Sequence, residues 1–263
     1  MERKIKEFKY DKKALENLGV IPFTLRKDSL KDEYIISWTT SPRYINEEIM
    51  NYYKSDLAHK DGTLWNIEKK YESVFMSRET HFRISEDFGR SISLVFPAAD
   101  CAIVRLYDRK KDIIGLTHSD IQRTTKNIVH EMVQYMKKHF DSNPKDIMVF
   151  VGAFAKEGMI WDKYPPFAEE NKKEWENYIE KIDDTHFNIK YGDKLYDQLI
   201  ESGLSEDNIY FDPDNTVKDN NYFSNNRSKL LKEREGRNLF GITFDSLPIY
   251  ENLKQENVRT RLK

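Results

Sequence analysis

Cysteine is almost absent from this sequence, because Cys101 is the only one in 263 residues. An intramolecular disulfide is therefore excluded, and a reducing, cytoplasmic setting is favoured. Long apolar runs are also absent, since the longest one, residues 147–155, is too short to cross a bilayer as a helix. The N-terminal residues contain no apolar segment of the kind found in secretory signals. We therefore expect a protein that has no membrane partner.

The chain also lacks an excess of charge of either sign. Its 43 basic and 45 acidic side chains give a net charge of −2, so no nucleic-acid partner is expected. Glycine and proline are few, at 10 and 8, and no repeat or flexible linker separates one part of the chain from another. We therefore predict a single domain that spans residues 1–263.

Hydrophobic and turn patterns divide the chain into strands and helices. Residues 101–107 are predicted to form a buried strand, the charged residues 108–112 a turn, and 113–117 the returning strand of a hairpin. The other predicted strands cover 34–40, parts of 73–84, 92–96, 146–151 and 239–244, and the predicted helices cover 46–57, 121–140, 167–182 and 191–202, with Gly203 as the C-cap of the last. Strands and helices do not alternate strictly. We therefore predict an α+β (mixed α/β) fold in which helices flank a central mixed sheet.

The predicted hairpin brings two reactive side chains together. Cys101 starts one strand, His118 ends the other, and the two positions are almost symmetric about the turn, so we expect them to face each other. Directly opposed residues place their Cβ atoms about 4.5–5.5 Å apart. A thiolate and an imidazole are ligands that zinc prefers, and the same pair can act as nucleophile and base. From the spacing alone, however, a small buried hydrophobe and a hydrogen-bonded structural histidine are the commoner roles.

Sequence motifs around this pair resemble those of a known family. Residues 98–104, AADCAIV, resemble the T-A-D-C-x-P-V segment of the laccase-domain, or YfiH-type, family, also described as polyphenol oxidases or purine nucleoside phosphorylases. His118 stands where that family has the histidine of H-A-G-W-R-G. Residues 77–81, SRETH, resemble the Q-x-H-G segment, which places His81 at the position of the family's first metal-site histidine.

The resemblance continues in the correct order over residues 75–244. Residues 149–155 resemble the L-G-P-A-I strand and turn, 221–227 resemble F-F-S-Y-R-R, and 235–237 resemble the closing T-G-R. The chain also departs from the pattern. Gln122 stands at the family arginine position, with Arg123 one place along, and Asn226 replaces one arginine of the R-R pair. The chain is thus identified as a divergent member.

The resemblance implies a fold like that of the YfiH and cytotoxic-necrotizing-factor proteins and a metal-dependent enzyme that acts on purine nucleosides. Phosphorolysis or deamination of adenosine- and inosine-type nucleosides is implied, with a nucleoside and phosphate as small-molecule partners. The implied metal ligands are His81, Cys101 and His118. Cys101, His118 and Arg227 are the implied catalytic residues, and Ser224, Arg227 and Arg237 would bind substrate or phosphate. Three such ligands fit zinc better than copper, since four-copper oxidase chemistry needs more histidines than the six present.

Two alternatives from other functional classes stay open. The fold of this family also resembles the catalytic domain of the cytotoxic necrotizing factor deamidases, which suggests a thiol hydrolase or deamidase with Cys101 as nucleophile and His118 as base. The other alternative is a catalytically inactive binding protein, which the loss of the family arginine at Gln122 would fit.

Overall fold

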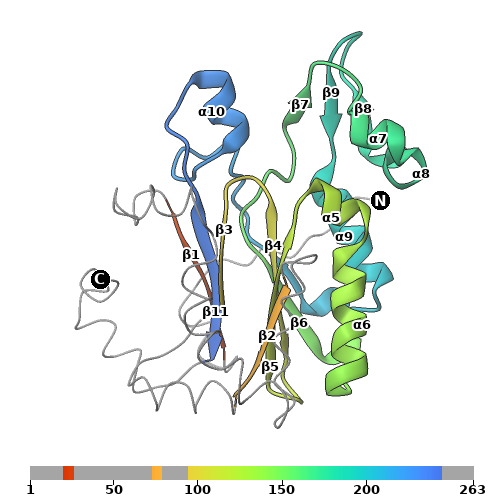
Figure 1. The fold of residues 1–263 in the computed structure, drawn as a ribbon, viewed down its shortest axis with the longest axis vertical. Helices are drawn as coiled ribbons and strands as arrows, with labels where there is room; N and C mark the ends of the chain where they lie inside the picture. Colours follow the sequence, from red (N-terminus) through yellow and green to blue (C-terminus); the bar gives the residue numbers. More distant parts are fainter. Residues whose placement is uncertain (1–19, 27–72, 79–93, 245–263) are drawn as a thin grey trace, which may run out of the picture.

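The structure, a computed structural model, describes residues 20–26, 73–78 and 94–244 (Figure 1). Its strands are β1 (Val20–Leu25), β2 (Ser73–Ser77), β3 (Leu94–Ala98), β4 (Ala102–Asp108), β5 (Ile113–Ser119), β6 (Ile147–Val151), β7 (Met159–Trp161), β8 (Ile179–Lys181), β9 (Phe187–Ile189), β10 (Ile209–Phe211) and β11 (Asn238–Phe244). Its helices are α5 (Ile121–Thr125), α6 (Ile128–Phe140), α7 (Pro166–Glu170), α8 (Lys172–Trp175), α9 (Tyr191–Glu201) and α10 (Asn225–Leu231). The predicted strand 34–40 and helix 46–57 lie outside the described residues.

A five-stranded sheet in the order β10-β6-β4-β5-β2 forms the centre of the fold. The strands β10 and β6 are parallel, and the other neighbours are antiparallel. Every residue of β4 and β6 is buried, because both strands lie between two covering layers. The predicted α+β fold with a central mixed sheet is therefore confirmed.

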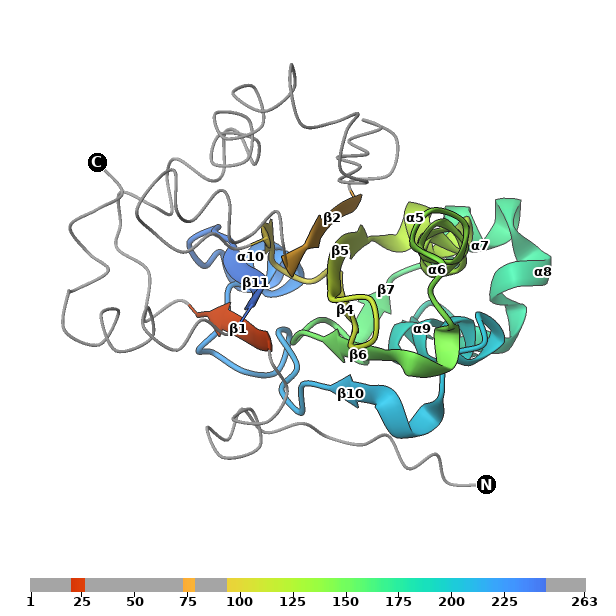
Figure 2. The same ribbon diagram turned by 90° about the horizontal axis from the view of Figure 1, so that it is seen from below.

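Helices α6 and α9 cover one face of this sheet, as Figures 1 and 2 show. In α6, Ile128, Met132 and Met136 recur at helical spacing, and all three are buried. They belong to one hydrophobic core with residues such as Val104 of β4 and Val149 of β6. The helical spacing of apolar residues thus explains which face of α6 packs on the sheet.

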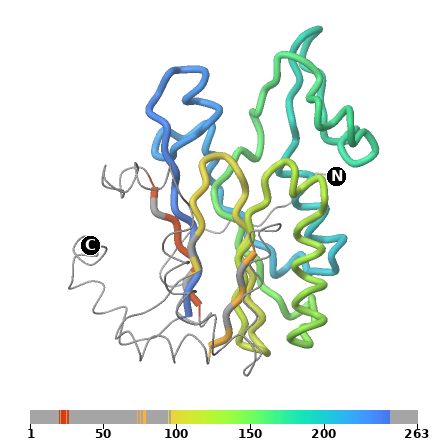
Figure 3. The backbone as a smooth tube through the Cα atoms, viewed as in Figure 1, coloured from red at the N-terminus to blue at the C-terminus, as the bar shows by residue number. Residues whose placement is uncertain are grey.

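A three-stranded sheet, β1-β11-β3, covers the opposite face. Its strand β11 pairs with β1 on one side and β3 on the other, so segments far apart in the sequence lie side by side (Figure 3). The two sheets approach closely at Gly152, where an added Cβ would lie 2.5 Å from a ring carbon of Phe240. Any side chain at position 152 would therefore displace the Phe240 ring.

Two predicted helices differ from the structure. The predicted helix 121–140 is divided into α5 and α6 at Asn127, which has a left-handed φ of 53° and caps α6 by accepting from the His130 amide at 3.2 Å. The predicted helix 167–182 is divided into α7, α8 and a short 3₁₀ turn at Glu176–Tyr178, and the prediction is wrong at its end, where Ile179–Lys181 forms β8 and pairs with β9. The pairing with a partner strand overrides the local helical preference there.

A third small sheet, β7-β9-β8, projects with α7 and α8 beyond the two large sheets (Figure 1). It is joined to the helix face by α9, which matches the predicted helix 191–202. Gly203 follows that helix with a φ of +86°, as expected of a residue that ends it in the left-handed conformation. None of the described helices combines the length and the apolarity needed to cross a membrane.

Candidate functional site

The β4–β5 hairpin forms as predicted, but its register differs by two residues from the expected one. Ile103, and not Cys101, lies opposite His118, and Ala102 lies opposite Ser119 as the last pair of the ladder. Cys101 lies one residue beyond this last pair, so the ladder does not itself set its distance from His118. Ile103, opposite His118, belongs to the hydrophobic cluster against which Cys101 packs, so Cys101 and His118 lie on the same side of the central sheet.

Contacts with the three-stranded sheet confirm this placement. The His118 imidazole stacks on the Phe96 ring of β3, with ring centroids 4.8 Å apart. Cys101 and Phe96 pack against the same hydrophobic cluster, which fills the space between the two large sheets. Cys101 and His118 are both half-buried, so this pair lies at the margin of that cluster. Both predicted site residues thus face the space between the two large sheets.

The Cys101 thiol lies in an environment that disfavours its charged form. Burial, together with the carboxylates of Asp120 and Asp100, raises the pKa of Cys101 to about 12, and the guanidinium groups of Arg237 and Arg123 oppose this shift only in part. The thiol is therefore protonated near neutral pH. A protonated thiol is a weak nucleophile, whereas binding of a metal cation releases the proton.

A hydrogen-bonded carboxylate immediately precedes Cys101. Asp100 Oδ1 accepts from Thr216 Oγ1 at 2.8 Å, and Oδ2 accepts from the backbone amide and the side-chain amide of Asn226, at 2.7 and 2.9 Å. The Asp100 carbonyl accepts from the Ala155 amide at 3.0 Å. The residue is buried. Asp100 thus fastens the Cys101 loop to three segments: the turn after β6, the loop before α10 and the start of α10.

Arg227 is buried and bonded entirely to the protein. Its guanidinium nitrogens donate to the carboxylate of Glu233 and to the backbone carbonyls of Thr216, Val217, Asp219 and Tyr222. Ser224, the N-cap of α10, accepts from the Arg227 amide at 3.1 Å. In this arrangement Arg227 and Ser224 hold the 216–224 segment in place, and every guanidinium nitrogen of Arg227 donates to the protein.

Arg237 differs from Arg227 in this respect. Its Nη1 donates to the Gly236 carbonyl at 2.8 Å, and within the described part of the chain no other group binds the rest of this half-buried guanidinium. Its charge acts on Cys101. At the family arginine position, Gln122 is exposed. The neighbouring Arg123 instead forms an ion pair with Asp120 and also acts on Cys101. Arg123 thus brings its charge close to Cys101, although that charge is paired.

The remaining histidines separate into exposed and undescribed residues. His130 and His139 are exposed on α6. His81, the expected third metal ligand, lies outside the described residues. Within residues 20–26, 73–78 and 94–244, no three His, Cys, Asp or Glu side chains are grouped to hold a metal ion. A three-ligand site built on Cys101 and His118 therefore requires a ligand from outside these ranges.

The donor chemistry of the pair is compatible with zinc. Zinc takes thiolate sulfur at about 2.3 Å and imidazole nitrogen at about 2.0–2.1 Å, so one ion can join two side chains that do not touch each other. The donor atoms of Cys101 and His118 are therefore of the kinds that zinc binds, and both face the space between the two large sheets.

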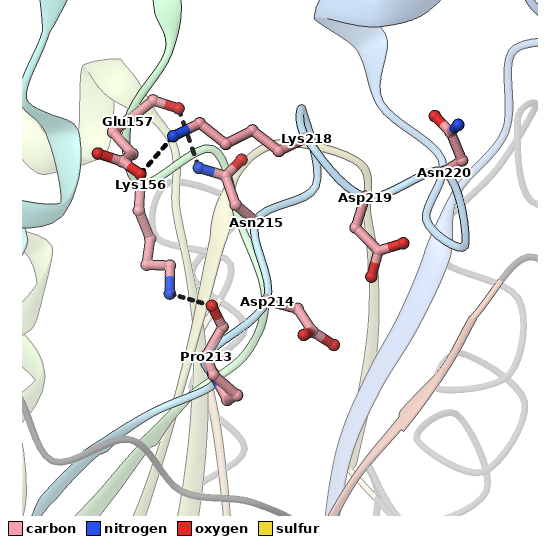
Figure 4. Close-up of a pocket in the computed structure, with 8 residues that line it drawn as sticks. All are labelled: Lys156, Glu157, Pro213, Asp214, Asn215, Lys218, Asp219 and Asn220. Atoms are coloured by element: carbon pink, nitrogen blue, oxygen red, sulfur yellow. Dashed lines mark hydrogen bonds and ion pairs between the residues drawn. The ribbon is translucent and has the colours of Figure 1, made fainter.

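An open polar pocket of about 620 Å³ lies beside the segments that hold Asp100. In Figure 4 the segment 213–220 forms one wall, and Lys156 and Glu157 form the other. Lys156 Nζ donates to the Pro213 carbonyl at 2.7 Å, and Lys218 pairs with Glu157. Two residues connect the pocket to the site, since both bind Asp100. Ala155 directly precedes Lys156 in one wall, and Thr216 lies within the segment 213–220 of the other.

Several residues at the site were not found by sequence reasoning. Thr216 and Asn226 bind Asp100, and the buried Tyr191 hydroxyl lies where β4 begins and β5 ends. Each is at least 70 residues from Cys101 in the chain, and no spacing rule links such positions. The only available signal was the family pattern, in which Asn226 appears as a departure from an arginine.

Comparisons with known proteins identify the family to which this chain is similar. Residues 89–245, more than half of the chain, match the model of a family described as multi-copper polyphenol oxidoreductase laccase. A purine nucleoside phosphorylase of Bacillus subtilis, YlmD, is 31% identical over 112 residues, which are 41% of this chain and 40% of YlmD. A purine nucleoside phosphorylase of Clostridium acetobutylicum is 39% identical over 54 residues, which are 20% of this chain and 23% of that protein. The matched segments thus span well under half of these relatives.

Two solved structures share the fold. The hypothetical protein YfiH of Bacillus licheniformis superimposes with a TM-score of 0.53 and 18% identity, covering 66% of this chain and 61% of that one. YlmD of Geobacillus stearothermophilus gives a TM-score of 0.53 and 16% identity, covering 67% of this chain and 62% of that one. The predicted YfiH-type fold is therefore confirmed.

Proposed function

Because the chain belongs to the YfiH-type family of laccase-domain proteins, we propose that it processes purine nucleosides, by phosphorolysis or by deamination. In this proposal zinc, rather than copper, is bound by His81, Cys101 and His118. The observation that carries the proposal is the placement of Cys101 and His118 on the same side of two adjoining strand ends. Two relatives named purine nucleoside phosphorylase suggest the substrate class.

Zinc at this site would supply polarisation of the attacking oxygen, from phosphate or from water. The residues of the chain orient the donors. The Phe96 ring fixes the plane of the His118 imidazole, and the bonds of Asp100 fix the loop that carries Cys101. Such support of metal ligands by neighbouring groups keeps the site in one geometry.

We assign the phosphate contact to Arg237. The nitrogens of Arg227 already donate to the protein, and Arg123 is paired with Asp120. Arg237 keeps donors available and lies close enough to Cys101 for its charge to act there. A planar guanidinium binds phosphate oxygens well. The polar pocket beside the site would take the hydroxyl groups of the nucleoside, since its carboxylates of Asp214 and Asp219 are hydrogen-bond acceptors.

The alternative of a thiol hydrolase is not favoured. A nucleophilic cysteine needs a thiolate or a base that takes its proton, and such cysteines lie in electropositive surroundings. Cys101 lies instead beside two carboxylates, with a raised pKa. Metal binding accounts better for a cysteine in this setting, because the cation compensates the nearby negative charge.

The proposal is tested with the full chain, assayed with adenosine and inosine in the presence and absence of inorganic phosphate. Phosphorolysis releases the free base only when phosphate is present, whereas deamination converts adenosine to inosine without it. Metal analysis should find about one zinc per chain, lost in Cys101→Ala and in His118→Ala. His130→Ala is the matched control, because His130 is exposed on α6 and should leave zinc and activity unchanged.

The role of Arg237 is tested by kinetics with varied phosphate. Arg237→Ala should raise the KM for phosphate roughly tenfold or more through the loss of a charged hydrogen bond, and Arg109→Ala, at an exposed turn position, should not. The proposal would be overturned if the purified wild-type protein contains no zinc, binds none when zinc is added, and forms no product. Fast alkylation of Cys101 would then favour the thiol hydrolase. A Cys101 thiol that does not react would favour the catalytically inactive binding protein.

A further inference from the structure

The hydroxyl of Tyr191 lies between the two strand ends that carry the site. Tyr191 begins α9, and its hydroxyl donates to the Ser119 carbonyl and accepts from the Ala102 amide at 3.4 Å. Ala102 directly follows Cys101, and Ser119 directly follows His118. One side chain thus contacts the backbone next to both residues of the pair, although it comes from an element about 70 residues further along the chain.

The same hydroxyl is linked to the start of the following helix. Thr124 Oγ1 lies 3.5 Å from the Tyr191 oxygen and 2.8 Å from Ser119 Oγ. The contacts of the hydroxyl with Ala102 and Thr124, at 3.4 and 3.5 Å, are long for hydrogen bonds. Together they connect β4, β5, α5 and α9 at one buried point.

The hydroxyl acts where the ladder stops. Ala102 and Ser119 form the last pair of β4 and β5, so no further ladder pair fixes the Cys101 backbone relative to His118. The Tyr191 ring itself is held firmly, since it is 1% exposed and packs edge-on against Phe154 with centroids 5.2 Å apart. A fixed ring places its hydroxyl at a fixed point between the two strand ends.

Tyrosine at this position is not explained by packing alone. A phenylalanine would fill the same apolar space, whereas a buried hydroxyl is costly unless its hydrogen bonds are made. Burial also raises the pKa of the Tyr191 phenol, so the group remains a neutral donor at physiological pH. The hydroxyl therefore serves the contacts that it makes.

We infer that Tyr191 is a positioning residue whose hydroxyl fixes the separation of Cys101 and His118. The inference rests on the proposed function for the role of that separation in binding a metal. It assigns Tyr191 no contact with substrate or metal, because among the described residues the hydroxyl bonds to the backbone beside the pair and to the Thr124 side chain.

The test compares Tyr191→Phe with Tyr196→Phe in the full chain. Tyr196 lies on the same helix and is also buried, but its hydroxyl donates to Glu206 at 2.7 Å, away from the strand ends. The first readout needs no metal: it is the rate at which iodoacetamide alkylates Cys101, the single cysteine of the chain. Tyr191→Phe should speed alkylation several-fold, and Tyr196→Phe should not.

The second readout is titration with Co²⁺ as a spectroscopic substitute for zinc, followed through the thiolate-to-cobalt absorption band. Tyr191→Phe should weaken Co²⁺ binding about tenfold, as loss of a group that orients metal ligands does. If Tyr191→Phe does not fold, Thr124→Val, which removes one partner of the hydroxyl, should change both readouts in the same direction by less.

The outcomes separate the two proposals. Equal alkylation rates in wild type, Tyr191→Phe and Tyr196→Phe would overturn the positioning role. A wild-type protein that binds no Co²⁺ would overturn the metal site, and the alkylation rates would still decide whether Tyr191 fixes the Cys101 backbone.

Discussion

The two ends of the β4–β5 hairpin are held by different kinds of contact. At the turn end, the Asp108 carboxylate accepts from the backbone amides of Lys110 and Lys111, at 2.9 and 3.1 Å. At the open end, where the site lies, the contacts come from distant segments, through Tyr191 and Asn226. The turn end is thus determined by residues close in sequence, whereas the open end forms only when other parts of the fold are in place.

This difference separates stability from the geometry of the site. Loss of a turn contact should lower the free energy of unfolding without moving Cys101 relative to His118. Loss of an open-end contact should lower the free energy of unfolding and also move Cys101 relative to His118. Substitutions at the two ends therefore test whether the site depends on the fold as a whole.

The largest effect is expected from Asp100→Ala at the open end. The change leaves the buried Thr216 hydroxyl and two half-buried donors of Asn226 without their acceptor, so the free energy of unfolding should fall by about 2–4 kcal/mol. Alkylation of Cys101 should also become faster. Urea unfolding followed by circular dichroism measures the first effect, and mass spectrometry the second. A stability loss below about 0.5 kcal/mol would show that this carboxylate does not hold the open end.

The next effect is a pH dependence at Asp212, which follows β10 and donates its amide to the Val151 carbonyl at the open end. Burial raises the pKa of Asp212 to about 6, above the value of about 3.9 in an unfolded chain. The folded state therefore binds this proton more tightly. The stabilisation from this group is complete below about pH 4 and is lost as the pH rises through about 6.

Asp212→Asn removes this loss while retaining an acceptor for the Asp214 amide, which donates to Asp212 at 3.0 Å. The variant should be more stable than wild type by about 1–3 kcal/mol at pH 7 and similar to it at pH 4. Urea unfolding at pH 4, 5, 6 and 7 gives the comparison. Parallel stability curves for the two proteins would contradict the expected titration.

A smaller effect is expected from Asp108→Ala at the turn end. The carboxylate is fully buried and binds two turn amides, but its Oδ2 has no hydrogen-bond partner among the described residues. Removal of that unpaired oxygen offsets part of the lost bonding, so a loss of about 1–2 kcal/mol is expected. Alkylation of Cys101 and Co²⁺ affinity should equal those of wild type. A change in either readout would show that the turn end also positions the site.

The smallest effect is expected from Asp141→Asn, near the same turn. Asp141 pairs with Lys111 at 3.0 Å, but its side chain is almost fully exposed. Exposed ion pairs contribute little, and asparagine accepts the left-handed backbone of this position, where φ is 53°. The free energy of unfolding, measured by urea denaturation, should therefore change by no more than about 0.5 kcal/mol. A larger loss would mean that this pair supports the turn.

The same contrast explains what could be predicted from the sequence. The hairpin was predictable, because two apolar runs flank a charged turn and the turn bonds are local. Its register was not, because it depends on turn geometry: Asp112 takes a left-handed φ of 50°, and Asp108 pairs with Ile113. The resulting ladder places Ile103 opposite His118.

The site was predictable only in part, through Cys101 and His118. The family motifs identified both residues, and the apolar strand patterns predicted the hairpin that places them on one side of the sheet. The contacts that orient them come from Thr216, Asn226 and Tyr191, whose positions depend on how separate elements pack. The motifs also offered Arg227 for phosphate, but they could not show that its guanidinium bonds to the carbonyls of Thr216 and Tyr222.

The pairing of β1 with β11 has a consequence for the order in which this protein forms on the ribosome. Val20 lies opposite Phe244, so the middle strand of the outer sheet emerges after nearly every other described element. Until then, none of the described strands pairs with β3 in that sheet, and the Phe96 side of the His118 ring is supported by an incomplete layer. Pairing across such a long loop is slow compared with closing the local β4–β5 hairpin. Nascent chains therefore make the hairpin early and cover its Cys101–His118 face last.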